Sequence, residues 1–136
     1  MNINDVNLKK IFNSAIKNHK ENNFSVAEKL YQQILEIDPL HFDSIFYLAS
    51  LSAQMKNFNK AKELFERAIK IKPNYAIAYN NLGAVLKELG MFRESVNACE
   101  KAITIQPDNA ATYSNLGAAL RELSMFRESV NACEKA

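Results

Sequence analysis

The sequence has few of the residues that make turns. Its 136 residues include three glycines, three prolines and no tryptophan. A β-sandwich or barrel needs many turns and clusters of β-branched residues, so this scarcity argues against those folds and favours long helices. Hydrophobic residues still make up 48% of the chain, which is enough for a core. We therefore expect a single helical domain.

An excess of charge of either sign is also missing. Seventeen Lys and Arg residues stand against fifteen Asp and Glu, which leaves a net charge of +2. That charge is too small to indicate an electrostatic surface for nucleic acid or a membrane. The start of the chain, MNINDVNLKKIFNSAIKN, has no apolar run long enough for a secretory signal or a membrane anchor. The sequence thus favours a cytoplasmic protein without nucleic-acid or membrane partners.

Motifs for reaction chemistry are absent as well. There is no glycine-rich phosphate loop, no GxSxG and no Cys and His pair at metal-ligand spacing. The two histidines, His19 and His41, have no second ligand in local register, which argues against a metal site. The sequence predicts a protein that is not an enzyme and holds no cofactor or metal.

A duplicated stretch dominates what is present. The sequence of residues 79–102, YNNLGAVLKELGMFRESVNACEKA, recurs at residues 113–136 as YSNLGAALRELSMFRESVNACEKA. Four aligned positions differ, all mildly: Asn80 and Ser114, Val85 and Ala119, Lys87 and Arg121, Gly90 and Ser124. A fixed period of this size, from Tyr79 to Tyr113, is typical of a stacked array, in which one short unit buries its apolar face only against a neighbour.

The same period continues to the N-terminus. The residues in register are Phe24, Phe58, Phe92 and Phe126; Pro39, Pro73 and Pro107; Ala15, Ala49, Gly83 and Gly117; and Ala27, Ala61, Ser95 and Ser129. They define repeats 8–41, 42–75 and 76–109 and a short fourth repeat, 110–136. Residues 1–7 are expected to extend the first helix, with Asp5 a candidate cap.

Each repeat is predicted to contain two helices, because its apolar residues follow a 3.6-residue period. In the third repeat, Gly90 is expected to supply the left-handed residue that ends the first helix. The second helix should end before Pro107. The small side chains at Gly83 and Ser95 predict a close approach of the two helices. In the second repeat we expect Asn57 to be the left-handed residue.

The two cysteines, Cys99 and Cys133, occupy equivalent places in neighbouring repeats. Packed helices lie about 8–10 Å apart, whereas the Cα atoms of a disulfide lie within about 7 Å. We therefore interpret both as reduced core cysteines.

The pattern resembles the tetratricopeptide repeat over about residues 8–136. The residues that carry the resemblance are Tyr79, Leu82, Gly83, Ser95, Cys99, Ala102 and Pro107 with their equivalents. Ile11, Ile34 and Ile45 depart from the pattern, and the fourth proline is missing. The resemblance implies an all-α, right-handed α-solenoid of antiparallel helix pairs, with about 3.8 repeats and seven to eight helices. The stretch KPNYAIAYNNLGAVLKELG is most similar to repeats of O-linked N-acetylglucosamine transferases.

This resemblance implies a non-catalytic interaction module whose first helices line a concave groove that binds a partner peptide or helix. Asn13, Tyr47, Asn81 and Asn115 form a row in that groove, with one residue at the same position of each repeat. Side-chain amides can pair with a peptide backbone, although they can equally bridge neighbouring helices. Phe12, Ile16, Phe46 and Tyr47 predict an aromatic contact surface. Lys87 and Arg121, each followed by Glu, continue the groove, although such pairs are more often solvated.

Three other possibilities bear on function. The carboxylate clamp of some co-chaperone repeats is disfavoured, because Phe12, Ile16, Ile77 and Asn81 stand in its places. The chain could instead recruit substrates for a larger transferase, or act as a self-assembling scaffold. The fourth repeat stops before its second helix is complete, which predicts a segment of a longer array. The partly open residues Leu116, Leu120, Val130 and Cys133 then predict a homo-oligomer, through this end or through helix exchange.

Overall fold

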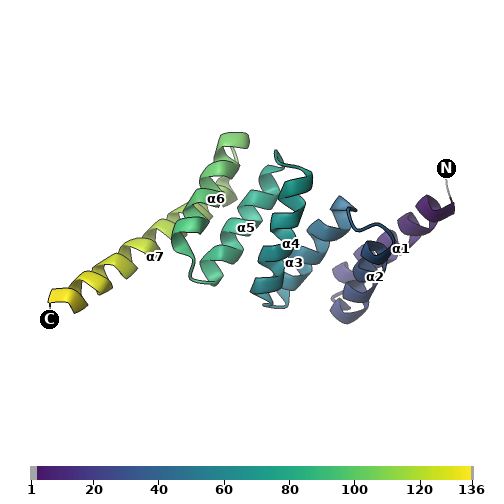
Figure 1. Ribbon diagram of the computed structural model, residues 1–136, viewed down its shortest axis with the longest axis horizontal. Coiled ribbons are helices and arrows are strands. Elements are labelled where there is room, and N and C mark those ends of the chain that lie inside the picture. The colour runs from purple at the N-terminus through teal and green to yellow at the C-terminus, as the bar shows by residue number, and fades with distance from the viewer. Residues whose placement is uncertain (1–2, 136) are drawn as a thin grey trace. The chain divides into compact units, whose positions relative to one another are not determined.

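The computed structural model describes residues 3–135, with side chains described for residues 5–131. Within that range the chain forms seven helices and no strands, which confirms the all-α class (Figure 1). The helices are α1 (Ile3–Lys20), α2 (Phe24–Ile37), α3 (Phe42–Gln54), α4 (Phe58–Ile71), α5 (Ala76–Glu88), α6 (Phe92–Ile105) and α7 (Ala110–Lys135).

The helices gather into two compact units, residues 1–72 and residues 73–136. In the first unit α1 pairs with α2, α3 pairs with α4, and α2 packs against α3. In the second unit α5 pairs with α6, and α7 packs against both. Three helical hairpins are therefore present, each covering the apolar stripe that its helices cannot bury alone.

Each hairpin turn contains one left-handed residue, at the same position of each repeat. These residues are Asn22 (φ 65°), Lys56 (φ 62°) and Gly90 (φ 77°). At each turn the next backbone N–H reaches back five residues, as Met91 N–H does to the Leu86 carbonyl at 2.9 Å. This double-bonded helix end requires the left-handed conformation at one fixed position. The prediction for Gly90 is confirmed.

The prediction that Asn57 is left-handed is wrong. Asn57 has φ −91° and is the N-cap residue of α4, while Lys56 takes the left-handed conformation. The Asn57 N–H bonds to the Ser52 carbonyl at 2.8 Å, which places Lys56 at the strained position. The hydrogen-bond pattern thus overrides the preference of asparagine for this conformation.

The N-terminal cap also differs from expectation. Because α1 already begins at Ile3, Asp5 lies inside its first turn rather than at the cap. A carboxylate there still stabilises the helix, because it interacts favourably with the N-terminal end of the dipole.

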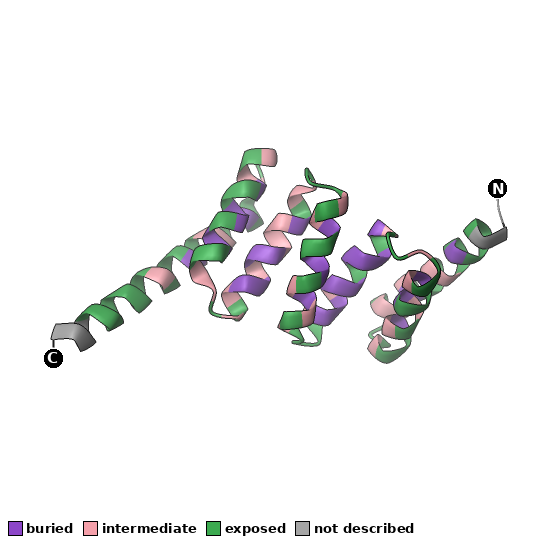
Figure 2. Ribbon diagram, viewed as in Figure 1, coloured by how far each residue is buried: buried purple, intermediate pink, exposed green. Residues whose placement is uncertain are grey.

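The fourth repeat is not the expected hairpin. α7 continues without a break through Ser124, the equivalent of Gly90. A left-handed conformation costs a residue with a Cβ about 1–2 kcal/mol. At Lys56 this cost is offset because α4 then buries Ala61, Leu64, Phe65 and Ala68. Residues 125–131 gain no such burial, since all of them are exposed in this structure (Figure 2), so the helix continues.

The predicted close approach of α5 and α6 is confirmed. The Ser95 hydroxyl donates to the Gly83 carbonyl at 2.6 Å. A Cβ atom built on Gly83 would lie only 2.7 Å from Cys99 Sγ. Cys99 is a free, buried thiol, as predicted, and burial raises its pKa against a smaller lowering by the Ser95 hydrogen bond. The side chain of Cys133 lies outside the described residues.

Candidate functional site

A groove of about 550 Å³ lies in the first unit, where side chains of α1 and α3 face each other. Its lining consists of Phe12, Asn13, Ile16, His19, Lys20, Asn22, Tyr47 and Gln54. Four of the residues predicted from the sequence, Phe12, Asn13, Ile16 and Tyr47, are brought together here. No carboxylate is among the lining residues, so Lys20 makes this groove weakly cationic.

The apolar wall of the groove is a cluster of aromatic rings. The centroid of the Phe12 ring lies 6.3 Å from that of Tyr31, 5.7 Å from that of His41 and 5.9 Å from that of Tyr47, all in tilted arrangements. Tilted pairs at these distances are favourable. Since α1, α2 and α3 all contribute rings to this cluster, the neighbouring rings hold the exposed ring of Tyr47 in place.

The predicted groove residue Phe46 does not lie on this surface. Its side chain is only 8% exposed. Its ring is 5.8 Å from Phe65 and 5.5 Å from Tyr47 by centroid distance, both edge to face. Consecutive residues of a helix point about 100° apart, and here the side of α3 that carries Phe46 is covered by Phe65 of α4. Phe46 supports Tyr47 from the core side instead.

The polar end of the groove is organised by His19, which the sequence did not single out for this purpose. Its Nδ1 lies 3.1 Å from the Tyr31 hydroxyl, and its Nε2 bonds to Gln54 Oε1. Burial, and then the neighbouring Tyr47, raise the pKa of Tyr31, so its phenol remains a neutral O–H donor. Donation to Nδ1 leaves the ring proton on Nε2, which donates to Gln54. The one clue in the sequence was that Gln54 follows His19 by nearly one repeat.

The other two asparagines of the predicted row lie in the second unit and bond to a neighbour. Asn115 donates to Asn80 Oδ1 at 2.9 Å, and Asn80 donates to Asn81 Oδ1 at 3.4 Å. This short chain of amides joins α5 to α7. Bridging of neighbouring helices, the alternative role for such residues, is thus part of what Asn115 does, whereas Asn81 accepts a bond from within α5.

The predicted cations Lys87 and Arg121 line a hollow of about 340 Å³ between α5 and α7, together with Glu88, Glu122, Phe92 and Ala118. Its lining holds two cations and two carboxylates, so their formal charges balance. Among the residues that the structure describes, no group of His, Cys, Asp and Glu is arranged to hold a metal ion. No helix within residues 3–135 combines the length and the apolar character needed to cross a membrane.

Two family models match the middle of the chain. One, described as the tetratricopeptide repeat, matches residues 76–109, and the other, described as TPR repeat, matches residues 51–90. Between them the two models cover residues 51–109. A comparison with curated protein sequences finds no significant match.

Solved structures of tetratricopeptide-repeat proteins share this fold. The first TPR of Spaghetti (RPAP3) bound to an HSP90 peptide has a TM-score of 0.82 at 20% identity, covering 86% of this chain and 93% of that one. The Sgt2 TPR domain of Aspergillus fumigatus has a TM-score of 0.82 at 22% identity, covering 90% and 82%. The Thermobaculum terrenum O-GlcNAc transferase has a TM-score of 0.81 at 23% identity, covering 88% of this chain but 23% of the transferase. These likenesses confirm the helical solenoid class predicted from the sequence.

Proposed function

We propose that this chain binds an extended segment of a partner protein in the groove lined by Phe12, Asn13, Ile16 and Tyr47. Tetratricopeptide repeats are generally non-catalytic modules for protein–protein interaction, which supports the proposal. The observation that carries the proposal is the combination of aromatic rings and side-chain amides in one preformed groove. Such concave sites, mostly apolar with a few placed polar groups, are typical of ligand binding.

The chemistry of the groove restricts the segment that fits. Phe12, Ile16 and Tyr47 favour one inserted apolar or aromatic side chain. Asn13 and the amide nitrogen of Gln54 can pair with backbone carbonyls beside it, since each offers N–H donors. Lys20, with no carboxylate in the lining, favours a neutral or acidic segment over a basic one.

The HSP90 peptide held by the Spaghetti repeat is acidic, SRMEEVD. A carboxylate clamp of that kind needs several cations, whereas Lys20 is the single Lys or Arg in this lining. An acidic residue beside an apolar anchor therefore fits this groove better than a free C-terminus. A cytoplasmic location remains a prediction.

A second candidate is recruitment of substrates to an attached transferase, which the fold of the O-GlcNAc transferase region supports. In that case the asparagine row would bind the substrate backbone. The bonds among Asn80, Asn81 and Asn115 already use part of the row, which favours the first-unit groove as the main contact.

The experiment is a selection of displayed random peptides on the chain, followed by affinity measurements on synthetic winners by fluorescence anisotropy. Tyr47→Ser should weaken binding at least tenfold, because an aromatic hot spot contributes more than about 1.4 kcal/mol. Asn13→Ala should weaken it less. Val26→Ser is the control, since Val26 is an exposed apolar residue on α2 outside the lining, 48% exposed against 37% for Tyr47.

Peptide binding in the first-unit groove and substrate recruitment by the asparagine row predict opposite effects of these substitutions on affinity. Peptides that bind Tyr47→Ser at full affinity but lose affinity for the double variant Asn81→Ala with Asn115→Ala would contradict the first-unit groove. That result would assign binding to the asparagine row.

A further inference from the structure

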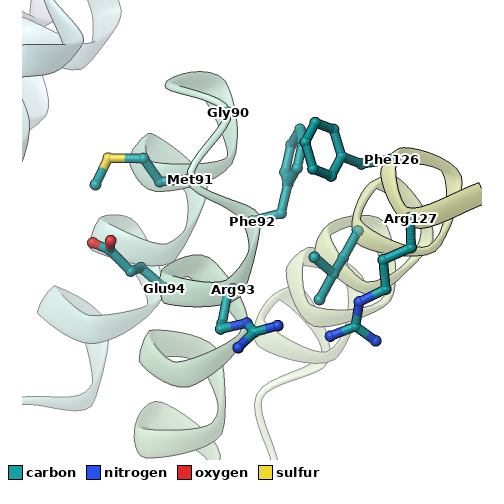
Figure 3. Close-up of a pocket in the computed structure, with 8 residues that line it drawn as sticks. Gly90, Met91, Phe92, Arg93, Glu94, Phe126 and Arg127 are labelled. Carbon is teal, nitrogen blue, oxygen red and sulfur yellow. The ribbon is translucent and has the colours of Figure 1, made fainter. Parts of the chain in front are cut away.

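A hollow of about 330 Å³ lies in the second unit, where the first turn of α6 faces α7 (Figure 3). We call it the second-unit hollow. Its side chains include two phenylalanines, one leucine and two arginines, namely Phe92, Leu123, Phe126, Arg93 and Arg127. Aromatic residues and arginine are the types that protein–protein interfaces contain in excess over the rest of the surface. The composition of the hollow is therefore that of a contact surface, and none of its residues belongs to the first-unit groove.

The apolar part of the hollow is formed by rings from two helices. Phe126 of α7 points toward Phe92 of α6, with Leu123 beside them (Figure 3). In the three closed hairpins the phenylalanine at this repeat position is half-buried, whereas Phe126 is 59% exposed. A ring exposed to this extent leaves a large apolar area in water, which a partner side chain can cover. The hollow thus offers a binding position for one apolar or aromatic side chain.

The straight course of α7 places Phe126 in this position. A bend at Ser124, like the turn at Gly90, would carry Phe126 to the start of a fourth hairpin, where Phe92 stands in the third. Because α7 continues through Ser124, the ring of Phe126 stays beside the first turn of α6 instead.

The polar part of the hollow is cationic on the side that faces α7. Arg93 and Arg127 extend from the two helices on the same side of the rings (Figure 3). Glu94, the one carboxylate among the lining residues, leaves α6 on the side away from α7. Within the part of the chain that the structure describes, neither guanidinium has an ion pair or a hydrogen bond. Guanidinium groups beside apolar surface favour a carboxylate, which accepts strong charge-assisted hydrogen bonds from them.

We propose that the second-unit hollow is a further docking site, which binds a partner-protein segment with an aromatic or long apolar side chain next to Asp or Glu. The apolar side chain inserts between Phe92 and Phe126, and the carboxylate accepts hydrogen bonds from Arg93 or Arg127. Charge complementarity selects this occupant, because a basic segment would bring like charges together and an uncharged one would leave both guanidiniums without a partner. The site goes beyond the binding proposed for the first-unit groove and depends on none of its residues.

A neighbouring hollow gives the bound segment a direction. The hollow of about 340 Å³ that contains Lys87 and Arg121 shares Phe92 with the second-unit hollow. The formal charges of that neighbouring lining balance, whereas two arginines face one glutamate in the second-unit hollow. The acidic residue of the segment therefore binds at Arg93 and Arg127, and the rest of the segment continues across Phe92.

The experiment measures the affinity of a short fluorescent peptide, with a central phenylalanine followed by two glutamates, by fluorescence anisotropy. Every protein sample carries Tyr47→Ser, which weakens binding in the first-unit groove. Two further peptides replace both glutamates by glutamines or by lysines. We expect the glutamate peptide to bind most tightly and the lysine peptide most weakly.

Substitution of the exposed ring tests the apolar part. Phe126→Ser should weaken binding of the glutamate peptide by about tenfold or more, since a covered aromatic ring is a typical hot spot. Met125→Ser is the matched control and should leave the affinity unchanged. Met125 is the preceding residue, is 56% exposed and lies outside the lining.

Reversal of one charge tests the polar part. Arg127→Glu should reverse the preference, so that the lysine peptide binds more tightly than the glutamate peptide. Lys101→Glu makes the same change in net charge at an exposed position of α6 outside the lining, and should preserve the preference. Since Phe126 and Arg127 are both exposed, circular dichroism should show the same helix content in all these variants.

Three results would overturn the second site: no binding of the glutamate peptide, equal affinity for the three peptides, or full affinity after Phe126→Ser. Binding that appears only when Tyr47 is restored would support the first-unit groove and would likewise overturn the second site. Sedimentation tests the remaining occupant. A dimer that Phe126→Ser abolishes and the glutamate peptide does not displace would assign the hollow to a second copy of the chain.

Discussion

The contact between α5 and α6 makes a quantitative prediction about two glycines that have the same sequence surroundings. Gly83→Ala places a methyl group 2.7 Å from Cys99 Sγ, in a region where both residues are buried. Gly117→Ala places the same methyl group on an exposed part of α7 with nothing within 4 Å. The two substitutions therefore share one effect and differ in another.

The shared effect is helix propensity. Replacing glycine by alanine inside a helix stabilises the fold by about 1 kcal/mol. Gly117→Ala should show this gain alone. Gly83→Ala adds the cost of overpacking, about 1–3 kcal/mol, because Cys99 is enclosed and cannot move aside freely. The free energy of unfolding should thus differ by about 1–3 kcal/mol between the two variants.

Urea denaturation followed by far-UV circular dichroism measures this difference, at a concentration where the chain is monomeric. The added variant Gly83→Ala with Cys99→Ala tests the cause, because removal of the Sγ atom should recover part of the loss. Equal stabilisation by Gly83→Ala and Gly117→Ala would refute the close contact. A loss at Gly83 that Cys99→Ala fails to relieve would assign the clash to the Ser95 backbone instead, 3.4 Å away.

Other predictions concern single sites. His19→Ala should cost about 1–3 kcal/mol in urea unfolding, since it leaves the buried Tyr31 hydroxyl without a partner, and Tyr31→Phe should recover part of that cost in the same background. Lys56→Gly should raise the urea midpoint by relieving about 1 kcal/mol of left-handed strain, whereas Gly90→Ala should lower it by a similar amount, and the same sign for both would contradict the turn geometry. The pKa values of Cys99 and Tyr31 are raised in the folded chain, so the unfolded chain loses these two protons at lower pH than the folded chain does. The free energy of unfolding should therefore fall as the pH rises above about 9 to 10. A flat profile in that range would count against the burial of both groups.

Some residues of the groove could be predicted from the sequence, and others could not. Asn13 and Tyr47 were found because the repeat period carries every groove position from one repeat to the next. The same rule misplaced Phe46, which shares its register with Phe12. In the first repeat this position is Phe12, which is half-exposed. In the second repeat it is Phe46, which Phe65 of α4 covers. Exposure depends on the neighbouring helix, which the period does not encode.

The two hydrogen bonds that link Tyr31, His19 and Gln54 could not be predicted from the sequence, for a related reason. Each residue lies on a different helix, and only Tyr31 stands at a recurring core position, that of Phe65 and Cys99. Only the packing of α1, α2 and α3 brings the three polar groups together.

The sequence by itself determined the helical hairpins, the turn at Gly90 and the close approach at Gly83, because these follow from local periodicity and from side-chain size. The tertiary structure alone decided the course of the chain at Ser124. Closing a hairpin there requires a strained backbone, and that strain persists only where the returning helix buries enough apolar surface to offset it. The residues on both sides of Ser124 are nearly those of the third repeat, so the difference between a hairpin and a straight helix lies in the balance of these two free energies.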